Sequence, residues 1–309
     1  MASLAPTSAA APPLAPTASA PGIAVGPTGP VVGRRRRRKS GWGYNAVALL
    51  IIVLSAFPVY WMINTSFRRS IDIRTDVQFF PFGGSLDNYR RVFETDFFWS
   101  SFGNSLKVTA LTVVLAVFSA FLAALAVSRF RFRGRVPFLV MILIVQMVPA
   151  EALMISLVKV LDGWDVRNSI IGLTIAYVAF VLPFSVWTLR GFVDGVPREL
   201  EEAAMVDGSS RIRAFFTITL PLIAPGLVAT GIFGFIQAWN EYTLALVIMD
   251  RPEMETLPLW LQGFNKGARG TDWGGVMAGS TLITVPVIVF FMAVQRRVVA
   301  GLTAGAVKG

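Results

Sequence analysis

The sequence contains no cysteine and no histidine among its 309 residues. The absence of cysteine excludes disulfide bonds and thiol nucleophiles, and the two absences together exclude zinc sites of the usual kind and imidazole acid–base chemistry. Charged residues are also scarce, at 15% of the chain, against 54% hydrophobic residues and a mean hydropathy of +0.63. A soluble domain of this size could not bury so much apolar surface. The composition therefore predicts that most of the chain faces lipid or other helices.

Six apolar segments each reach the ~20 residues that a helix needs to cross the hydrocarbon of a bilayer. A helix is required because every backbone amide must be paired within the segment. The predicted spans are Tyr44–Ile63, Ser105–Val127, Val136–Val158, Ile170–Leu189, Leu222–Met249 and Val276–Val294. The fifth segment is long and carries polar residues near its middle, so its limits stay open. The fold class predicted is an all-α integral membrane protein with six transmembrane helices.

The charges between the spans predict the orientation. With the N-terminus inside, the cytoplasmic segments hold 17 Lys and Arg residues and the external segments hold 10, whereas 11 acidic residues are external and 5 cytoplasmic. The positive-inside rule therefore places both termini in the cytoplasm. The basic run Arg34–Lys39 contributes most, and we interpret it as a topology signal rather than a nucleic-acid patch.

Residues 1–39 differ in composition from the rest of the chain. They are rich in Ala, Pro, Ser, Thr and Gly and end in the basic run, which predicts a disordered cytoplasmic tail. A cleaved signal peptide is disfavoured because the basic run lies far from Met1. Residues 40–309 then form one transmembrane domain with a cytoplasmic tail over residues 295–309. The external segment Asn64–Asn104 either caps the helix ends or meets a soluble partner.

A polar segment, at about residues 197–221, follows the fourth span. Pro197 suits the first position of a helix, and Arg198–Val206 is dense in helix-forming residues. Gly208 tolerates the left-handed turn that closes a helix, and a serine after it can cap a second one. The segment therefore predicts a hairpin of two short cytoplasmic helices. An ordinary pair of surface helices between two spans would show the same residue spacing and is the alternative.

This hairpin carries a family signature. Glu202-Ala203-Ala204, three residues, Gly208, nine residues, Ile218, one residue and Leu220-Pro221 match EAA-x3-G-x9-I-x-LP at every fixed position. The chain resembles the permeases of binding-protein-dependent ABC importers in this respect, over roughly residues 44–309. Further motifs make it similar to the carbohydrate branch, in particular the partner permease of maltose-type transporters: D-N-Y-x-x-V-F (87–93), N-S-L-K-V-T (104–109), W-N-E-Y (239–242), L-P-L-W-L (257–261) and G-L-T-A-G-A-V-K-G (301–309).

The resemblance implies a type I ABC importer permease fold in which the hairpin couples the spans to a cytoplasmic ATPase. The implied coupling residues are Glu202, Ala203, Ala204, Gly208, Ile218, Leu220 and Pro221. The implied partners are a second permease, two ATPase subunits and an extracellular or periplasmic sugar-binding protein, in a bacterial inner membrane. ATP and Mg would bind the ATPase. This chain has no G-x-x-x-x-G-K-[ST] phosphate loop, so we expect a transport subunit that is not an enzyme and holds no cofactor, metal or nucleic acid.

The transported solute implied by the resemblance is a sugar or oligosaccharide. Polar groups inside spans usually face a cavity or a partner helix, and five of them are candidates for the substrate pathway: Gln146, Glu151, Gln237, Asn240 and Glu241. Helix–helix hydrogen bonding is the alternative role for these residues. A permease for another solute such as polyamine or phosphate is the alternative function, because the hairpin is shared. An ion-coupled secondary transporter would not need the hairpin, and the sequence shows no convincing inverted repeat.

Overall fold

The computed structural model describes residues 42–75, 77–80, 83–265 and 270–306, with side chains as far as residue 295. The chain divides into two compact units, Met1–Ile52 and Val53–Gly309. In the first unit only residues 42–52 are described, and they form the start of helix α1 (Trp42–Ser66). The predicted tail over residues 1–39 lies outside the described residues. All the other described residues belong to the second unit.

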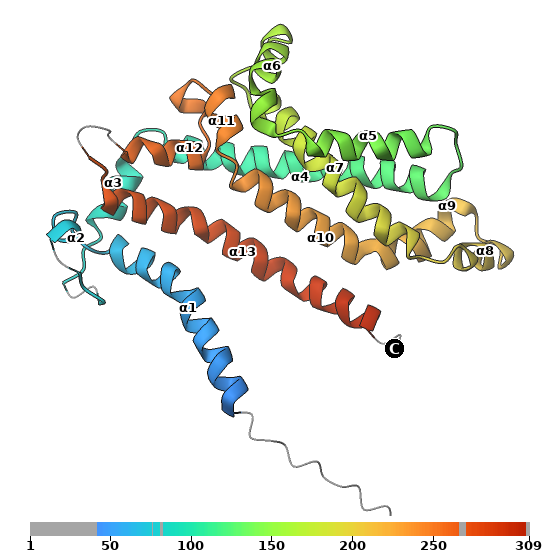
Figure 1. Ribbon diagram of the computed structural model, residues 1–309, viewed down its shortest axis with the longest axis horizontal. Helices are drawn as coiled ribbons and strands as arrows, with labels where there is room; N and C mark the ends of the chain where they lie inside the picture. The colour runs from blue at the N-terminus through green and yellow to red at the C-terminus, as the bar shows by residue number, and fades with distance from the viewer. Residues whose placement is uncertain (1–41, 76, 81–82, 266–269, 307–309) are drawn as a thin grey trace, which may run out of the picture. The chain divides into compact units, whose positions relative to one another are not determined.

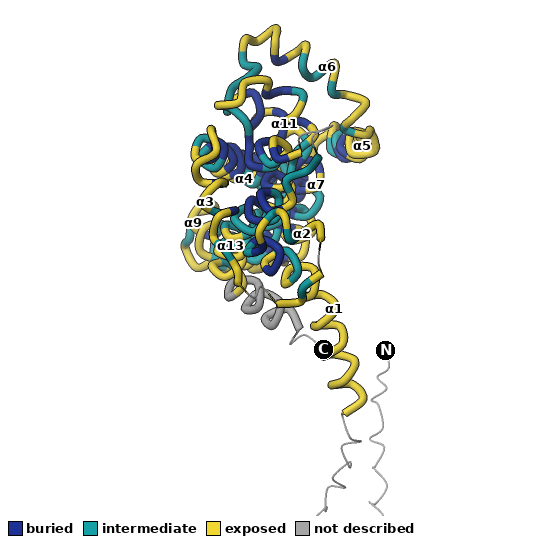
Figure 2. The backbone as a smooth tube through the Cα atoms, turned by 90° about the vertical axis from the view of Figure 1, so that its left-hand side faces the viewer, coloured by how far each residue is buried: buried dark blue, intermediate teal, exposed yellow. Residues whose placement is uncertain are grey.

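Three long helices form the centre of the second unit. Helices α4 (Phe98–Arg129), α7 (Ile170–Asp194) and α10 (Leu220–Trp239) pack against one another along their lengths (Figure 1). Ala116, Ala120 and Ala124 recur every fourth residue on α4 and are fully buried. Such a stripe of small residues lets the helix backbones approach closely, which is how helices in membranes gain packing energy. Figure 2 shows the buried residues concentrated along α4 and α7.

The described residues confirm the all-helical fold class. Five helices are long and apolar enough to cross a membrane, and a bent pair brings the number to six if it counts as one span. The last helix, α13 (Trp273–Ala306), packs against α10 and continues through residues 295–306, where the sequence predicted a tail. No strand occurs in the described ranges, where a single bridge joins Asn265 and Thr271.

The third predicted span is not one continuous helix. It consists of α5 (Arg135–Met147) and α6 (Ala150–Gly163), which are bent by 102° at the break between them. Pro149 explains the break, because it lacks an amide proton and forces the residue before it out of the helical region. Val148 is accordingly extended, with ψ at 123°. The helix predicted over Val136–Val158 is therefore interrupted at Val148 and Pro149.

The fifth predicted span also differs from the sequence pattern. Helix α10 ends at Trp239, and a separate short helix, α11 (Thr243–Ile248), follows. At its start, α10 continues without interruption from α9 (Arg211–Ala214) through a π-helical segment, Phe215–Thr219. Pro221 lies inside this continuous helix, directly after the π-helical segment, and has no amide proton to donate to the preceding turn.

The remaining helices gather at the ends of the long ones. Helix α2 is Asp72–Thr75, α3 is Asp87–Glu94 and α12 is Leu257–Leu261. Helices α3 and α12 lie at one end of the unit, whereas α8 (Arg198–Val206) and α9 lie at the other (Figure 1). Helix α3 packs on α13, so the prediction that the segment after α1 caps the helix ends is confirmed. Whether it also meets a soluble partner stays a prediction.

A polar cluster joins α3 to the start of α13, and we call it the α3–α13 clamp: Ser70, Asn88, Arg91 and Asp272. The Arg91 guanidinium lies 2.7 Å from Asp272 and donates to Ser70 at 2.9 Å and to Asn88 at 2.6 Å, and Ser70 donates to Asp272 at 3.2 Å. Burial alone would raise the pKa of Asp272. The amide of Gly275 and the charge of Arg91 outweigh burial and hold that pKa below its ordinary value of 3.8.

Candidate functional site

The predicted hairpin turn is present, but only its first helix is short and separate, because the second runs on from α9 into α10. The amide of Gly208 donates to the Met205 carbonyl at 3.1 Å, and the amide of Ser209 donates to the Ala204 carbonyl at 2.9 Å. This pair of bonds is the Schellman arrangement that ends many helices. Gly208 has φ at +91°, a conformation that L side chains rarely adopt. Ser210 then begins α9, because its side chain accepts from the amide of Arg213.

The surface of this hairpin carries exposed apolar side chains at its tip. Val206 is 87% exposed and Ile212 is 71% exposed, and Leu200 is also exposed. Exposed apolar side chains on a charged segment leave apolar surface that a binding partner can cover. Val206 and Ile212 could not be predicted as surface residues of interest, because one valine or isoleucine in a polar segment carries no signal until its exposure is known.

The residues of the signature fall into two groups. Glu202, Ala203, Ala204 and Gly208 lie on the hairpin and are exposed, except Ala204, which is half-buried. Ile218, Leu220 and Pro221 lie in the helix that enters the membrane segment, where the first two are half-buried and Pro221 is exposed. Leu220 packs against the buried cluster Val193, Val196 and Ile223 at the end of α7 and the start of α10. The first group can contact a partner, and the second group attaches the hairpin to the long helices. Their role in coupling stays a prediction.

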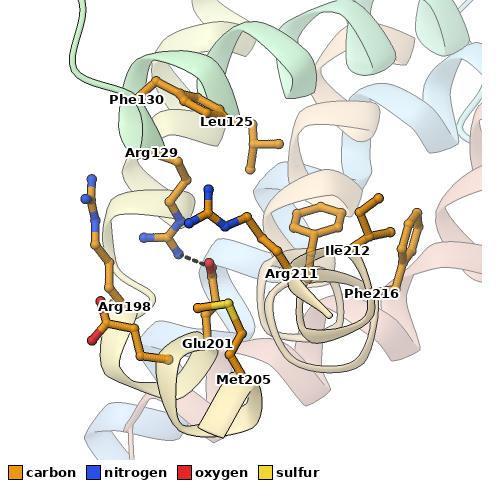
Figure 3. Close-up of a pocket in the computed structure, with 11 residues that line it drawn as sticks. Leu125, Arg129, Phe130, Arg198, Glu201, Met205, Arg211, Ile212 and Phe216 are labelled. Carbon is orange, nitrogen blue, oxygen red and sulfur yellow. Dashed lines mark ion pairs between the residues drawn. The ribbon is translucent and has the colours of Figure 1, made fainter. Parts of the chain in front are cut away.

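A cavity of about 390 Å³ lies between the hairpin and the end of α4. Apolar side chains and three arginines line it: Leu125, Arg129, Phe130, Arg198, Met205, Arg211, Ile212, Phe215 and Phe216, beside Glu201 and Glu202. Figure 3 shows Arg129 reaching from α4 toward Glu201 of α8. The nitrogen–oxygen distance is 2.9 Å, and the two side chains are 13% and 20% exposed.

The predicted pathway residues do not form one cluster. Gln146 and Glu151 are exposed and lie on opposite sides of the break at Pro149. Gln237 and Asn240 are exposed at the end of α10, where the Asn240 amide donates to the Ile236 carbonyl at 2.8 Å. Among the described residues, no hydrogen bond or ion pair joins the first two to the others.

Glu241 has a structural role at the break between α10 and α11. Its carboxylate accepts from the amides of Leu244 at 2.8 Å and Ala245 at 3.1 Å, and so caps the start of α11. Its backbone carbonyl accepts from the Tyr177 hydroxyl at 3.4 Å. These contacts correspond to the alternative that the sequence left open for polar residues within spans. A further contact of Glu241 with substrate stays a prediction.

The described residues contain no group of three or more acidic side chains that could hold a metal ion. The hairpin combines a turn closed by two hydrogen bonds, exposed side chains near that turn and an ion pair to α4. It therefore offers a surface that another protein can contact.

Comparison with known proteins points the same way. A family described as "Binding-protein-dependent transport system inner membrane component" matches residues 112–303. The chain is similar to a diacetylchitobiose uptake system permease protein of Streptomyces coelicolor, at 43% identity over 86% of this chain and 96% of the relative. It is also similar to a trehalose transport system permease protein of Mycobacterium tuberculosis, at 35% identity over 88% and 99% of the two chains.

The fold is likewise similar to a solved structure. A chain of a bacterial ABC transporter involved in the import of alginate matches with a TM-score of 0.71, at 22% identity, over 84% of this chain and 97% of that chain. The match confirms the helical arrangement of the second unit.

Proposed function

Because the chain belongs to the family of inner membrane components of binding-protein-dependent transport systems, we propose that it is the permease subunit of an ATP-driven importer for a sugar or oligosaccharide. The single observation that carries this proposal is the exposed hairpin that matches the family's signature at every fixed position. The substrate class rests on the relatives named for diacetylchitobiose and trehalose. Residues 40–309 act as one permease domain in this proposal.

The hairpin receives its movement from a separate ATPase. The exposed tip at Val206 and Ile212, with Glu202 and Ala203 beside it, fits a cleft on a cytoplasmic subunit. A small helix with alanine on its surface allows close approach of another backbone, and a rigid turn passes on a rigid-body displacement. Two ATPase subunits, a second permease and an external sugar-binding protein complete the assembly, and ATP and Mg are bound by the ATPase.

A permease that is driven by a cytoplasmic ATPase must have its hairpin in the cytoplasm, and the proposed topology then places both termini there as well. The absence of native cysteine allows a direct test, because a single introduced cysteine is then the only thiol of the chain. Asp207→Cys on the hairpin should resist a membrane-impermeant maleimide in intact cells, whereas Glu253→Cys at the other end of the unit should react. Reaction at position 207 but not at 253 would refute the orientation.

The function is tested on the purified assembly. The chain is expressed with its partner permease and ATPase, and ATP hydrolysis is measured with binding protein loaded with N,N′-diacetylchitobiose, trehalose or maltose, and with spermidine or phosphate as non-sugar arms. We expect an ATPase to co-purify and one of the sugars to stimulate hydrolysis. Stimulation by spermidine or phosphate alone would refute the sugar assignment, and absence of any bound ATPase would refute the importer.

The hairpin is tested in the same assembly. Gly208→Pro and Ala203→Trp should leave the chain in the membrane and abolish stimulated hydrolysis, because the first removes the turn and the second blocks close approach. Normal uptake by both variants would contradict the coupling role.

A further inference from the structure

The orientation of α8 is not determined by apolar packing. None of its nine residues is buried, and Val206 at its C-terminal end is 87% exposed. A helix of this length has little stability of its own in water, since nucleation costs more than a few hydrogen bonds return. Contacts elsewhere on the helix must therefore hold it at its angle to the long helices.

Glu201 provides the central contact, because three separate elements meet at its carboxylate. Its Oε1 lies 2.9 Å from an Nη of Arg129 at the end of α4, and it accepts from the Thr219 hydroxyl at 2.6 Å. Thr219 belongs to the π-helical segment and is completely buried. A partly buried carboxylate with two such partners is held more firmly than an exposed ion pair.

Two further bonds join the same elements. Arg198, at the first position of α8, donates to the Ser128 carbonyl at 2.6 Å. Arg129 also donates to the Val196 carbonyl, at 3.2 Å and 3.3 Å from its two terminal nitrogens. The last carbonyls of a helix have no partner within the helix, and a cation there is favoured by the helix dipole. The end of α4 is therefore attached both to the loop that leads into α8 and to the first residue of α8.

The π-helical segment makes this arrangement possible. Each residue of an α-helix turns the chain by about 100°, so the one extra residue that a π turn accommodates changes which side chain faces a given neighbour. Here Thr219 faces Glu201. A π turn inside a helix frequently marks a functional position, and this one contains one fixed position of the signature, Ile218, and ends directly before another, Leu220.

We propose that Glu201, Arg129 and Thr219 are positioning residues that carry the displacement of the hairpin into α4, an inference that rests on the proposed function. None of the three occupies a fixed position of the EAA signature. With the contacts in place, α8 and the end of α4 move as one body. Without these contacts, the chain bends at Gly208 and at Gly195, the residue that ends α7. The ATPase then moves the hairpin without moving the spans.

The test measures coupling rather than folding. The assembly is reconstituted in liposomes, and accumulation of radiolabelled N,N′-diacetylchitobiose is divided by the ATP hydrolysed. Glu201→Gln keeps the size of the side chain and should leave the ATPase bound, while lowering sugar per ATP about tenfold, the middle of the range for contacting pairs. Thr219→Val, which keeps the ion pair, should lower the ratio about threefold.

The charge-exchanged variant R129E/E201R separates positioning from a general structural defect. It should restore part of the ratio that each single change loses, because it re-forms the ion pair but not the two bonds from Arg129 to the Val196 carbonyl. Asp194→Asn is the matched control, since Asp194 pairs with Arg190 of the same helix at 3.2 Å and joins no two elements. It should leave the ratio unchanged.

Several results would overturn the inference. These are a wild-type ratio for Glu201→Gln or for Thr219→Val, no recovery in the charge-exchanged variant, or an equal loss in Asp194→Asn. The inference and the proposed function fail differently. A wild-type assembly that neither binds an ATPase nor imports sugar refutes the function, whereas a working wild type with fully coupled Glu201→Gln refutes only the positioning role.

Discussion

Replacing Gly208 by alanine isolates the conformational requirement of the hairpin turn. A Cβ at this position would meet no atom within 4 Å, so the change introduces no steric clash. The cost arises only from the backbone, because φ is +91° and an L residue in the left-handed region is disfavoured by about 1–2 kcal/mol. A cost of this size reduces the population of the closed turn by about 5- to 30-fold relative to open forms.

The expected consequence is local. Helix α8 has no buried residue, so opening the turn removes no core contact and should leave the thermal midpoint of the permease unchanged. Affinity for the ATPase should fall by up to the same factor of about 5 to 30, because binding must first restore the closed turn. The measurement is titration of the ATPase against the immobilised permease pair, with thermal unfolding recorded in parallel.

Two variants sharpen this experiment. Gly208→Asn should lose less affinity than Gly208→Ala, because asparagine visits the left-handed region more readily. Gly191→Ala is the control, since Gly191 also has open space around its Cβ position but lies in α7 with an ordinary backbone. Equal affinity of Gly208→Ala and the wild type, or an equal loss in Gly191→Ala, would refute the reasoning.

Three further changes test other parts of the structure. A Cβ on Gly226 would lie within 3.0 Å of Phe192, so Gly226→Ala should destabilise the α7–α10 contact by about 1–3 kcal/mol in thermal unfolding, whereas Gly231→Ala should not. Because the pKa of Asp272 is lowered, the α3–α13 clamp should be complete above pH 3.8 and weaken as pH falls through the lowered pKa. Amide hydrogen exchange at the start of α13 should become faster over that pH range, and Asp272→Asn should remove the pH dependence. Glu241→Ala should destabilise α11 by about 0.5–2 kcal/mol, and Glu241→Gln should have an intermediate effect, because the carboxylate caps the helix. Unchanged hydrogen exchange of the α11 amides would contradict the cap. Unchanged sugar uptake in both variants would contradict a substrate role for Glu241.

The local features of this chain could be predicted from its sequence because their causes are local. Apolar runs long enough to cross a bilayer indicated the long helices, and Pro197 and Gly208 marked the start and the turn of the hairpin. Pro149 was the exception. Its position in an apolar run did not reveal whether the helix would bend slightly or break by 102°. Neighbouring helices decide that outcome, since they determine which backbone groups remain paired.

The features that could not be predicted depend on distant parts of the chain. Arg129 and Glu201 are far apart in the sequence, and no periodic pattern connects an arginine at the end of one helix with a glutamate in a later one. The π-helical segment also has no composition of its own, because Phe215–Thr219 reads as an ordinary stretch of helix. The capping role of Glu241 could not be predicted either, because the end of α10 was hidden within a continuous apolar run.

The α3–α13 clamp has a consequence for biosynthesis. Arg91 and its partner Asp272 are separated by 181 positions, and Ser70 and Asp272 by 202. At ribosomal speeds of about 5–20 residues per second, Arg91 emerges roughly 10 to 40 s before its counter-ion exists. The clamp is thus among the last contacts to form as the nascent chain is completed. A translation product that stops before Asp272 therefore lacks the acidic partner of Arg91 at that end of the unit.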